Sequence, residues 1–190
     1  MDEVGRGCLF GPVAAAAVMV SPAGAQELQE AGVRDSKSLS PTQRQKLVPV
    51  IQSVAIAWKI ASASVAEIDR INILQATLLA MGRAVKELDP APDLCWVDGN
   101  RAIPDLAVPQ ETVVKGDQRS VVIAAASILA KEWRDRLILD LAESYPGYDL
   151  ASNKGYGTVK HRDGLRKLGL TPHHRRSFAP CRQTLEGLGG

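Results

Sequence analysis

Apolar and polar positions along the chain fall into two recurring patterns. Short runs rich in Val, Ile and Ala predict buried strands over residues 12–20 and 54–63, and shorter strands over 94–98 and 112–115. Between these runs lie longer segments in which apolar residues recur at every third or fourth position, which is the spacing of an amphipathic helix. A chain that alternates the two patterns in this way is typical of an α/β domain.

Capping residues strengthen the helical pattern. Ser40 and the proline after it predict the start of a helix over residues 41–53. A long helix is expected over 64–89, and Pro90 ends it. A second long helix is expected over 119–144, and its many alanines indicate close packing against a sheet.

The rest of the chain is a shorter and more polar C-terminal region. We expect a loop over 145–157 and a short helix near 158–168. A length of 190 residues is most simply one domain. We therefore expect a catalytic domain over 1–150, a small helical, basic extension of the same domain over 151–182, and a frayed tail over 183–190.

Two adjacent carboxylates stand directly before a Gly-Arg-Gly turn at the start of the chain. The pair is Asp2 and Glu3, and the turn contains Gly5, Arg6 and Gly7. Carboxylate oxygens are the ligands that hard divalent cations prefer, and glycines let a backbone approach a phosphate or sugar closely. The pattern indicates a metal-dependent phosphodiesterase site. The alternative is an ordinary surface turn whose carboxylates are solvated.

Two further acids occur where such a site needs them. Asp98 ends the predicted strand 94–98, and Asp117 lies just before the second long helix. Strand ends and helix entries hold carboxylates by the backbone, so that groups distant in sequence can converge. We therefore expect Asp2, Glu3, Asp98 and Asp117 to be both catalytic residues and metal ligands. Because the set lacks nitrogen and sulfur ligands, it favours Mg²⁺ or Mn²⁺ over zinc.

The net charge of +2 conceals an asymmetry along the chain. From residue 154 to residue 182 there is one acid, Asp163, against the basic residues Lys154, Lys160, Arg162, Arg166, Lys167, Arg175, Arg176 and Arg182. A basic surface beside an acidic metal site suits a polyanion whose backbone is held while one phosphate meets the metals. This favours a nucleic-acid partner over a merely solubilising surface.

Composition also bears on the cellular compartment. No stretch reaches the roughly 18 apolar residues of a membrane span, and no basic segment precedes the apolar residues 11–20, so we expect neither membrane contact nor a signal peptide. The cysteines, Cys8, Cys95 and Cys181, are far apart and form no Cys-x-x-Cys pair. We expect a monomer in the reducing cytoplasm.

Six short motifs resemble, in order, those of ribonuclease HII, the bacterial type 2 ribonuclease H. They are Asp2 to Gly7, Asp35 to Ser40, Val97 to Asn100, Lys115 to Asp117, Ile123 to Lys131 and Asn153 to Thr158. The resemblance extends from residue 2 to about residue 178, where His-His-Arg-Arg-Ser-Phe closes the series. Six motifs in the family's order are far more specific than one.

The resemblance implies a fold and an activity. The fold is the ribonuclease H-like fold, a mixed central sheet flanked by helices with acids at its strand ends. The activity is that of an endoribonuclease that hydrolyses the RNA strand of RNA/DNA hybrids and cuts 5′ to single ribonucleotides embedded in duplex DNA, leaving 5′-phosphate and 3′-hydroxyl ends. Such sites use two divalent ions, roughly 4 Å apart, one to activate water and one to stabilise the leaving oxygen.

Substrate recognition is expected from a small set of residues. On the family pattern, Gly5, Arg6 and Gly7 contact the 2′-hydroxyl, which distinguishes RNA from DNA. Tyr156 resembles the family's tyrosine that packs on the neighbouring deoxyribose, the alternative being a loop tyrosine that fills the core. Phosphate contacts are expected from Ser36, Lys37, Asn72, Ser120, Lys154, Arg175 and Arg176.

The histidines and one charged pair have plainer interpretations. His173 and His174 are adjacent on an extended segment and point to opposite faces, so packing or phosphate contact is favoured over a metal pair. His161 is expected at the surface of the short helix. Lys131 and Glu132 are expected in a local ion pair or at a solvated edge.

Other functional classes share parts of this pattern. A transposase or junction resolvase of the ribonuclease H-like group would share the acids, but the Gly-Arg-Gly turn together with Tyr156 argues against it. A nucleic-acid-binding protein without catalysis would be expected to have lost an acid. Ribonuclease HIII normally carries an extra N-terminal domain.

The start of the chain departs from the family pattern. In the family, apolar strand residues precede the Asp-Glu pair, whereas here Asp2 directly follows Met1. Either the natural chain begins further upstream, or fewer backbone hydrogen bonds hold Asp2. We expect upstream strand residues to raise activity and thermal stability together.

Overall fold

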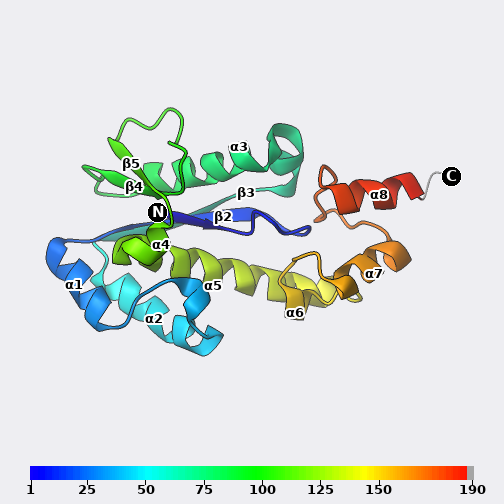
Figure 1. Cartoon of the computed structure of the whole chain (residues 1–190), viewed down its shortest axis with the longest axis horizontal. Coiled ribbons are helices and arrows are strands. Elements are labelled where there is room, and N and C mark those ends of the chain that lie inside the picture. The colour runs from blue at the N-terminus through cyan, green and yellow to red at the C-terminus, as the bar shows by residue number, and fades with distance from the viewer. Residues whose placement is uncertain (188–190) are drawn as a thin grey trace.

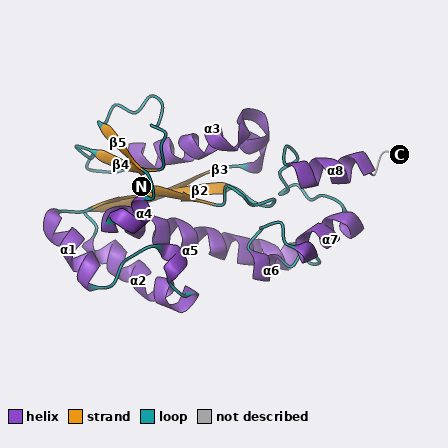
Figure 2. Ribbon diagram, in the orientation of Figure 1, coloured by secondary structure: helices purple, strands orange, loops and turns teal. Residues whose placement is uncertain are grey.

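The computed structural model describes residues 1–187 and has helices on both faces of a central sheet (Figure 1). Helix α3 (Val65–Lys86) covers one face, and α1 (Pro22–Glu30), α2 (Pro41–Val54) and α5 (Val121–Ser144) lie on the other. The short helices α6 (Leu150–Asn153), α7 (Val159–Leu168) and α8 (Ala179–Gly187) gather at one end, beyond the strands (Figure 2). The expected α/β class, with helices on both faces of a mixed sheet, is confirmed.

The strands form a mixed arrangement. β1 (Asp2–Val4) and β3 (Ala57–Ala63) both pair antiparallel with β2 (Val13–Met19). β4 (Cys95–Asp98) and β5 (Gln110–Val113) pair with each other in parallel. The backbone N–H of Asp98 donates to the carbonyl of Met1 at 3.1 Å, so β4 lies beside β1 and joins the two sets of strands.

Small side chains on β2 let helices approach both faces of the sheet. Alternate residues of a strand point to opposite faces. Ala15 and Ala17 belong to the apolar cluster under α3, whereas Ala16 and Val18 belong to the cluster under α5. The alanines of α5 match those of β2, and this close packing leaves the strand buried on both faces.

Most elements lie close to where the hydrophobic pattern predicts them. Ser40 caps α2 and Ser64 caps α3, and in each case the backbone N–H of the serine donates in return to the N3 side chain. β3 begins three residues later than expected because α2 continues through Val54. α3 is kinked at Asn72, whose φ of 67° is non-helical.

Three features differ from the prediction. Helix α1 was not expected, although Ser21 and Pro22 form the same cap signal as the start of α2. The loop expected over 145–157 contains α6. Helix α8 includes residues 183–187, where a frayed tail was expected; the remaining tail residues, 188–190, lie outside the described part.

The expectation for His161 was wrong, because its side chain is fully buried. Its Nε2 lies 3.0 Å from Nε2 of His174, and its ring packs edge-on against Tyr148. The apolar face of α7 packs against the C-terminal segment rather than facing solvent. This packing encloses the His161 ring.

Residues 151–182 pack against the start of the chain. Isolated β-bridges pair Cys8 with Tyr156 and Phe10 with His174. Phe10 packs in a cluster with Tyr148 and Leu165. The extension therefore shapes the loop that follows β1. Within residues 1–187, no helix is long and apolar enough to span a membrane.

Candidate active site

Three of the four expected carboxylates meet where β1 lies beside β4. One ligand oxygen each from Asp2, Glu3 and Asp98 lies within 4.8 Å of the others. Asp2 and Glu3 belong to β1 and Asp98 ends β4, which lies beside it. Pairing of these two strands is therefore what brings together acids almost 100 positions apart.

Asp117 lies outside that cluster of three but is joined to it through the backbone. It sits in α4 (Gly116–Arg119), and the N–H of the preceding Gly116 donates to Asp98 Oδ1 at 2.6 Å. The Asp117 carboxylate is 5% exposed, and Lys37 Nζ lies 3.3 Å from its Oδ2. The structure thus places all four acids in one region, with Asp117 at its margin.

The electrostatics of this cluster favour a cation. Burial, followed by the charge of Glu3, raises the pKa of Asp2 to about 7, although Ser127 opposes the rise as a hydrogen-bond partner. Burial also raises the pKa of Glu3, against the opposing effect of Arg6. Glu3 Oε2 is buried without a hydrogen-bond partner in the described residues. An all-oxygen set with an unsatisfied carboxylate oxygen fits a hard divalent cation.

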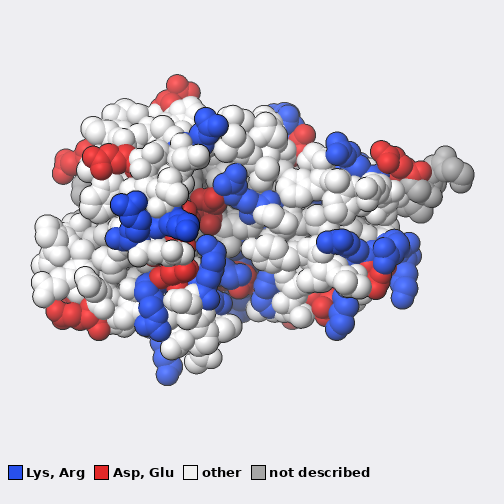
Figure 3. Space-filling view, in the orientation of Figure 1, with Lys and Arg blue, Asp and Glu red and all other residues white. Residues whose placement is uncertain are grey.

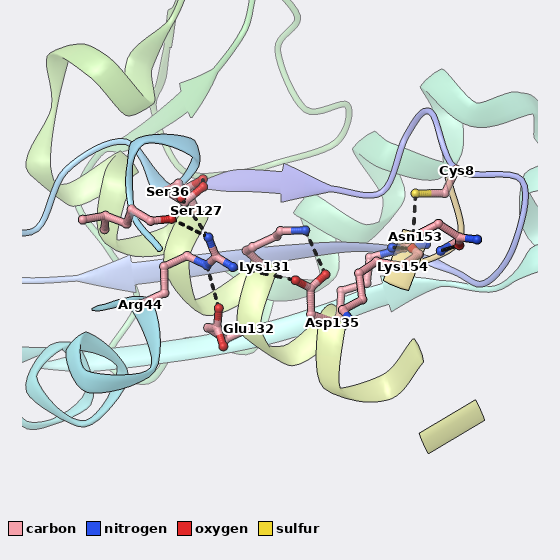
Figure 4. A network of polar contacts seen from close by, with 12 residues as sticks. Cys8, Ser36, Arg44, Ser127, Lys131, Glu132, Asp135, Asn153 and Lys154 are labelled. Carbon is pink, nitrogen blue, oxygen red and sulfur yellow. Dashed lines mark hydrogen bonds and ion pairs between the residues drawn. The ribbon is translucent and has the colours of Figure 1, made fainter. Parts of the chain in front are cut away.

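A network of polar side chains supports Asp2 through its hydrogen-bond partner Ser127, and Figure 4 shows Ser127 together with Ser36, Arg44 and Glu132. The hydroxyls of Ser36 and Ser127 lie 2.9 Å apart in the interior. Arg44 donates to the carbonyl of Ser36 at 3.2 Å and pairs with Glu132 at 2.6 Å. Ser36 is 4% exposed, so it lies in this support and not on the surface where a phosphate contact was expected.

Sequence reasoning did not single out Ser127 or Arg44, although Ser127 falls within one quoted motif. The local ion pair expected for Lys131 is confirmed, with Asp135 at 2.8 Å. Glu132 instead pairs across elements with Arg44 of α2. Only a known contact between α2 and α5 could have revealed that partner.

The Gly-Arg-Gly turn packs against the buried side chain of Arg134. Gly5 has a φ of 90°, and a Cβ there would clash with Arg134 Nε. Glycine is therefore required by both conformation and space. Arg6 is exposed and its Nη1 lies 3.2 Å from Glu3 Oε1, which places the turn beside the carboxylate cluster.

Two fully buried guanidinium groups bind the loop after β1. Arg134 donates to the carbonyls of Phe10, Pro12 and Lys154 at 2.8–3.0 Å. Arg175 donates to three carbonyls, with 2.7 Å to Gly5, 2.9 Å to Arg6 and 2.9 Å to Gly11. The expected phosphate contact from Arg175 is wrong, because this side chain is 0% exposed and its donors face the protein backbone.

Three further expected contact residues differ in exposure and in what they touch. Tyr156 is 43% exposed, and its Cε1 is 3.9 Å from the position of a Cβ on Gly7. Lys154 is half-buried and its ammonium donates to the carbonyl of Ala151. Arg176 is exposed, and its backbone N–H donates to Asp69 of α3 at 3.0 Å.

The two remaining expected contacts have structural roles of their own. Asn72 Oδ1 accepts from the N–H groups of Leu74 and Gln75 at 3.0 and 3.1 Å and so caps the second part of α3. Ser120 caps α5. Ser120 and Asp117 also line a cavity of about 790 Å³, so this cap lies next to the acidic region.

Charges on one face match this arrangement. In Figure 3, acidic side chains near the middle of the view are surrounded by Lys and Arg. An acidic centre in a basic surround can hold cations while attracting the backbone of a polyanion.

Comparisons with known proteins agree with the geometry. The profile of the family described as ribonuclease HII matches residues 1–181. A ribonuclease HII from Acaryochloris marina is 60% identical over 97% of this chain and 93% of its own length. The ribonuclease H2 of Pyrococcus horikoshii superposes with a TM-score of 0.86 at 25% identity, over 99% of this chain and 96% of that one.

A more distant structure, that of Bst-RNase HIII in complex with Mn²⁺, shares the fold with a TM-score of 0.76 at 20% identity over 97% of this chain and 68% of that one. The carboxylate cluster, the Gly-Arg-Gly turn that follows Asp2 and Glu3, and these likenesses have one explanation. The chain belongs to the ribonuclease HII family and is an endoribonuclease that acts on RNA/DNA hybrids.

Proposed function

We propose that this endoribonuclease also cuts 5′ to a single ribonucleotide embedded in duplex DNA and leaves 5′-phosphate and 3′-hydroxyl ends. The observation that carries the proposal is the placement of the Gly5–Gly7 turn between the Glu3 carboxylate and the Tyr156 ring. A sugar held at the turn would have carboxylates on one side and an aromatic ring on the other.

Asp2, Glu3, Asp98 and Asp117 would hold two Mg²⁺ or Mn²⁺ ions. When bound, such ions supply an activated water and stabilise the departing oxygen of a phosphodiester. The protein's part is to hold the oxygens in place. Strand pairing fixes Asp2 and Glu3, the Gly116 N–H orients Asp98, and Lys37 restrains Asp117. The mutual repulsion of the buried acids is relieved when cations occupy the site.

Recognition would be divided between backbone and side chains. Arg6 and Gly7 are exposed residues of the turn, and their backbone N–H groups would suit a 2′-hydroxyl. The partly exposed ring of Tyr156 would pack on the deoxyribose that follows the ribonucleotide. Among the expected phosphate contacts, the cationic side chains of Lys37, Lys154 and Arg176 are exposed or half-buried.

We further propose that the protein acts as a monomer in the cytoplasm. Cys8, Cys95 and Cys181 are all buried free thiols, which fits a reducing compartment. Residues 151–182 would serve as a basic extension of the catalytic domain over residues 1–150, because they pack directly onto the loop after β1.

The position and chemistry of the cut test the proposal. A labelled duplex with one ribonucleotide should be cut at one position, on the 5′ side of that ribonucleotide. A ligase should then rejoin the two fragments, because the downstream fragment carries a 5′-phosphate and the upstream fragment a 3′-hydroxyl. An all-DNA duplex of the same sequence is the control. Cleavage of continuous RNA/DNA hybrids with no cut at the single ribonucleotide would contradict the proposal while leaving the family's activity intact.

A further inference from the structure

The carbonyl groups of the Gly-Arg-Gly turn point into the protein. Arg175 Nη2 donates to the carbonyl of Gly5 at 2.7 Å, and Nη1 donates to that of Arg6 at 2.9 Å. A planar guanidinium presents its two terminal nitrogens in a fixed fork. One side chain therefore fixes two successive peptide units.

Fixing the carbonyls also fixes the amides. In a trans peptide, the C=O of one residue and the N–H of the next lie in one plane and point in opposite directions. The peptides after Gly5 and Arg6 are trans. With both carbonyls held inward, the N–H groups of Arg6 and Gly7 point away from the buried guanidinium, and neither donates to any group in residues 1–187.

The buried charge of Arg175 is compensated by uncharged groups. Its side chain is fully buried beside Arg134, and neither guanidinium pairs with a carboxylate in the described residues. A buried charge without a counter-ion is costly. The Phe178 ring, 5.1 Å from the guanidinium carbon, and the three carbonyls are its compensation.

We propose that Arg175 is a positioning residue for ribonucleotide recognition, which aims the N–H groups of Arg6 and Gly7 at the 2′-hydroxyl of the substrate. The inference rests on the proposed function of the turn. Arg175 touches no substrate atom. It determines instead whether two donors are presented together, so its loss should reduce selectivity for RNA more than affinity for duplex.

Binding without divalent metal tests this role independently of cleavage. We would compare the dissociation constants for a duplex with one ribonucleotide and for an all-DNA duplex of the same sequence, in EDTA. Two hydrogen bonds to a neutral hydroxyl predict a wild-type preference of about five- to tenfold or more. Arg175→Met should reduce the preference to near one and change all-DNA affinity by less than about twofold.

Two further variants separate geometry from charge and from stability. Arg175→Lys keeps the charge but lacks the planar fork, so it should lose the preference as Arg175→Met does. Leu165→Ala should lower stability in the apolar cluster against which Phe178 packs, and should keep the preference despite a lower melting temperature.

The outcomes distinguish the positioning role of Arg175 from the proposed function of the Gly5–Gly7 turn. A full preference in Arg175→Met, or restoration of it by Arg175→Lys, would overturn the positioning role. Loss of preference in Leu165→Ala to the same degree would also overturn it, by showing that general destabilisation suffices. A wild-type protein without any preference would instead contradict the proposed function of the turn, and this inference with it.

Discussion

Gly116 donates its backbone N–H to Asp98 Oδ1 at 2.6 Å, and this bond joins the two segments that carry Asp98 and Asp117. A Cβ on Gly116 would lie 3.1 Å from the same oxygen and 2.5 Å from Ile123 Cδ1. The glycine is therefore required by space, because α5 packs directly behind it. The positions of two expected metal ligands depend on one residue that carries no side chain.

Gly116→Ala should consequently impair catalysis more than folding. A displacement of about 1 Å at a catalytic group can cost roughly 100-fold in rate, and we expect a loss of that order in kcat/KM. Gly82→Ala is the matched control, because a Cβ there meets only Ile103, at 3.3 Å, away from the acids. Equal activity of the two variants would show that the Gly116 contact does not position the ligands.

Divalent cations should stabilise the folded protein by relieving repulsion among the acids. Ligand binding to the folded state alone adds about 2.7 kcal/mol at 100 times the Kd. Melting temperature should therefore rise with Mg²⁺ in the wild type and much less in Asp98→Asn. In EDTA, Asp98→Asn should melt no lower than the wild type, since it removes one of the clustered charges. A Mg²⁺-dependent rise of equal size in both proteins would place the ion elsewhere.

His161 and His174 should make stability depend on pH. His161 Nδ1 lies 2.9 Å from the Tyr156 carbonyl and must donate to it, so its Nε2 accepts from His174. His174 Nδ1 accepts in turn from the Thr171 N–H at 3.0 Å. Both rings are therefore neutral, since protonation would set two donors face to face. Burial lowers the pKa of both, and that of His174 to about 3.

Because the folded-state pKa values lie below the unfolded value of 6.5, the unfolded state binds more protons as pH falls. The contribution of the histidine pair to stability should be full above pH 6.5 and decline toward pH 3, by on the order of 2 kcal/mol at pH 5. The raised pKa of Asp2 acts in the opposite direction over the same range, so the contribution of the pair is the difference between the wild type and a histidine variant. Urea unfolding at pH 7.5 and pH 5 measures the change in stability for each protein. His174→Gln should lose less stability than the wild type on going to pH 5, whereas His173→Gln, outside the hydrogen-bond chain, should behave as the wild type does. An equal change in all three proteins would show that the pair does not contribute.

Tyr156 should matter more at a junction than along a continuous hybrid. Tyr156→Ala removes the ring beside Gly7, and cleavage at a single ribonucleotide should fall by at least about tenfold, with a smaller loss on an RNA/DNA hybrid. Tyr156→Phe keeps the ring and should retain activity on both. Steady-state kcat/KM on the two substrates is the measurement, and equal losses on both would exclude junction sensing by this residue.

The sequence predicted the elements that depend on local signals. The cap at Ser40 and the apolar spacing of α3 and α5 gave helices close to those observed. Asp98 and Asp117 were singled out because they stand at a strand end and a helix entry, and Asp2 and Glu3 because they precede the Gly-Arg-Gly turn. Helix α1 was missed although Ser21 and Pro22 form a helix N-cap signal. These successes and this omission all concern neighbours along the chain.

The residues that were misjudged depend on distant partners. Arg175 was taken for a surface cation, but its partners are carbonyls some 170 positions away. His161 was placed at the surface because its partner, His174, belongs to another segment. A side chain that can be either solvated or satisfied by a remote backbone carries no local signal that separates the two states.

Cleavage of a duplex with one ribonucleotide by the wild type and Asp98→Asn, each with and without Mg²⁺, tests the central claim most directly. We expect a cut 5′ to the ribonucleotide only in the wild type with Mg²⁺, while Asp98→Asn binds the duplex with unchanged affinity in EDTA. Near-normal cleavage by Asp98→Asn, or cleavage by the wild type without a divalent ion, would contradict a metal site built on these carboxylates.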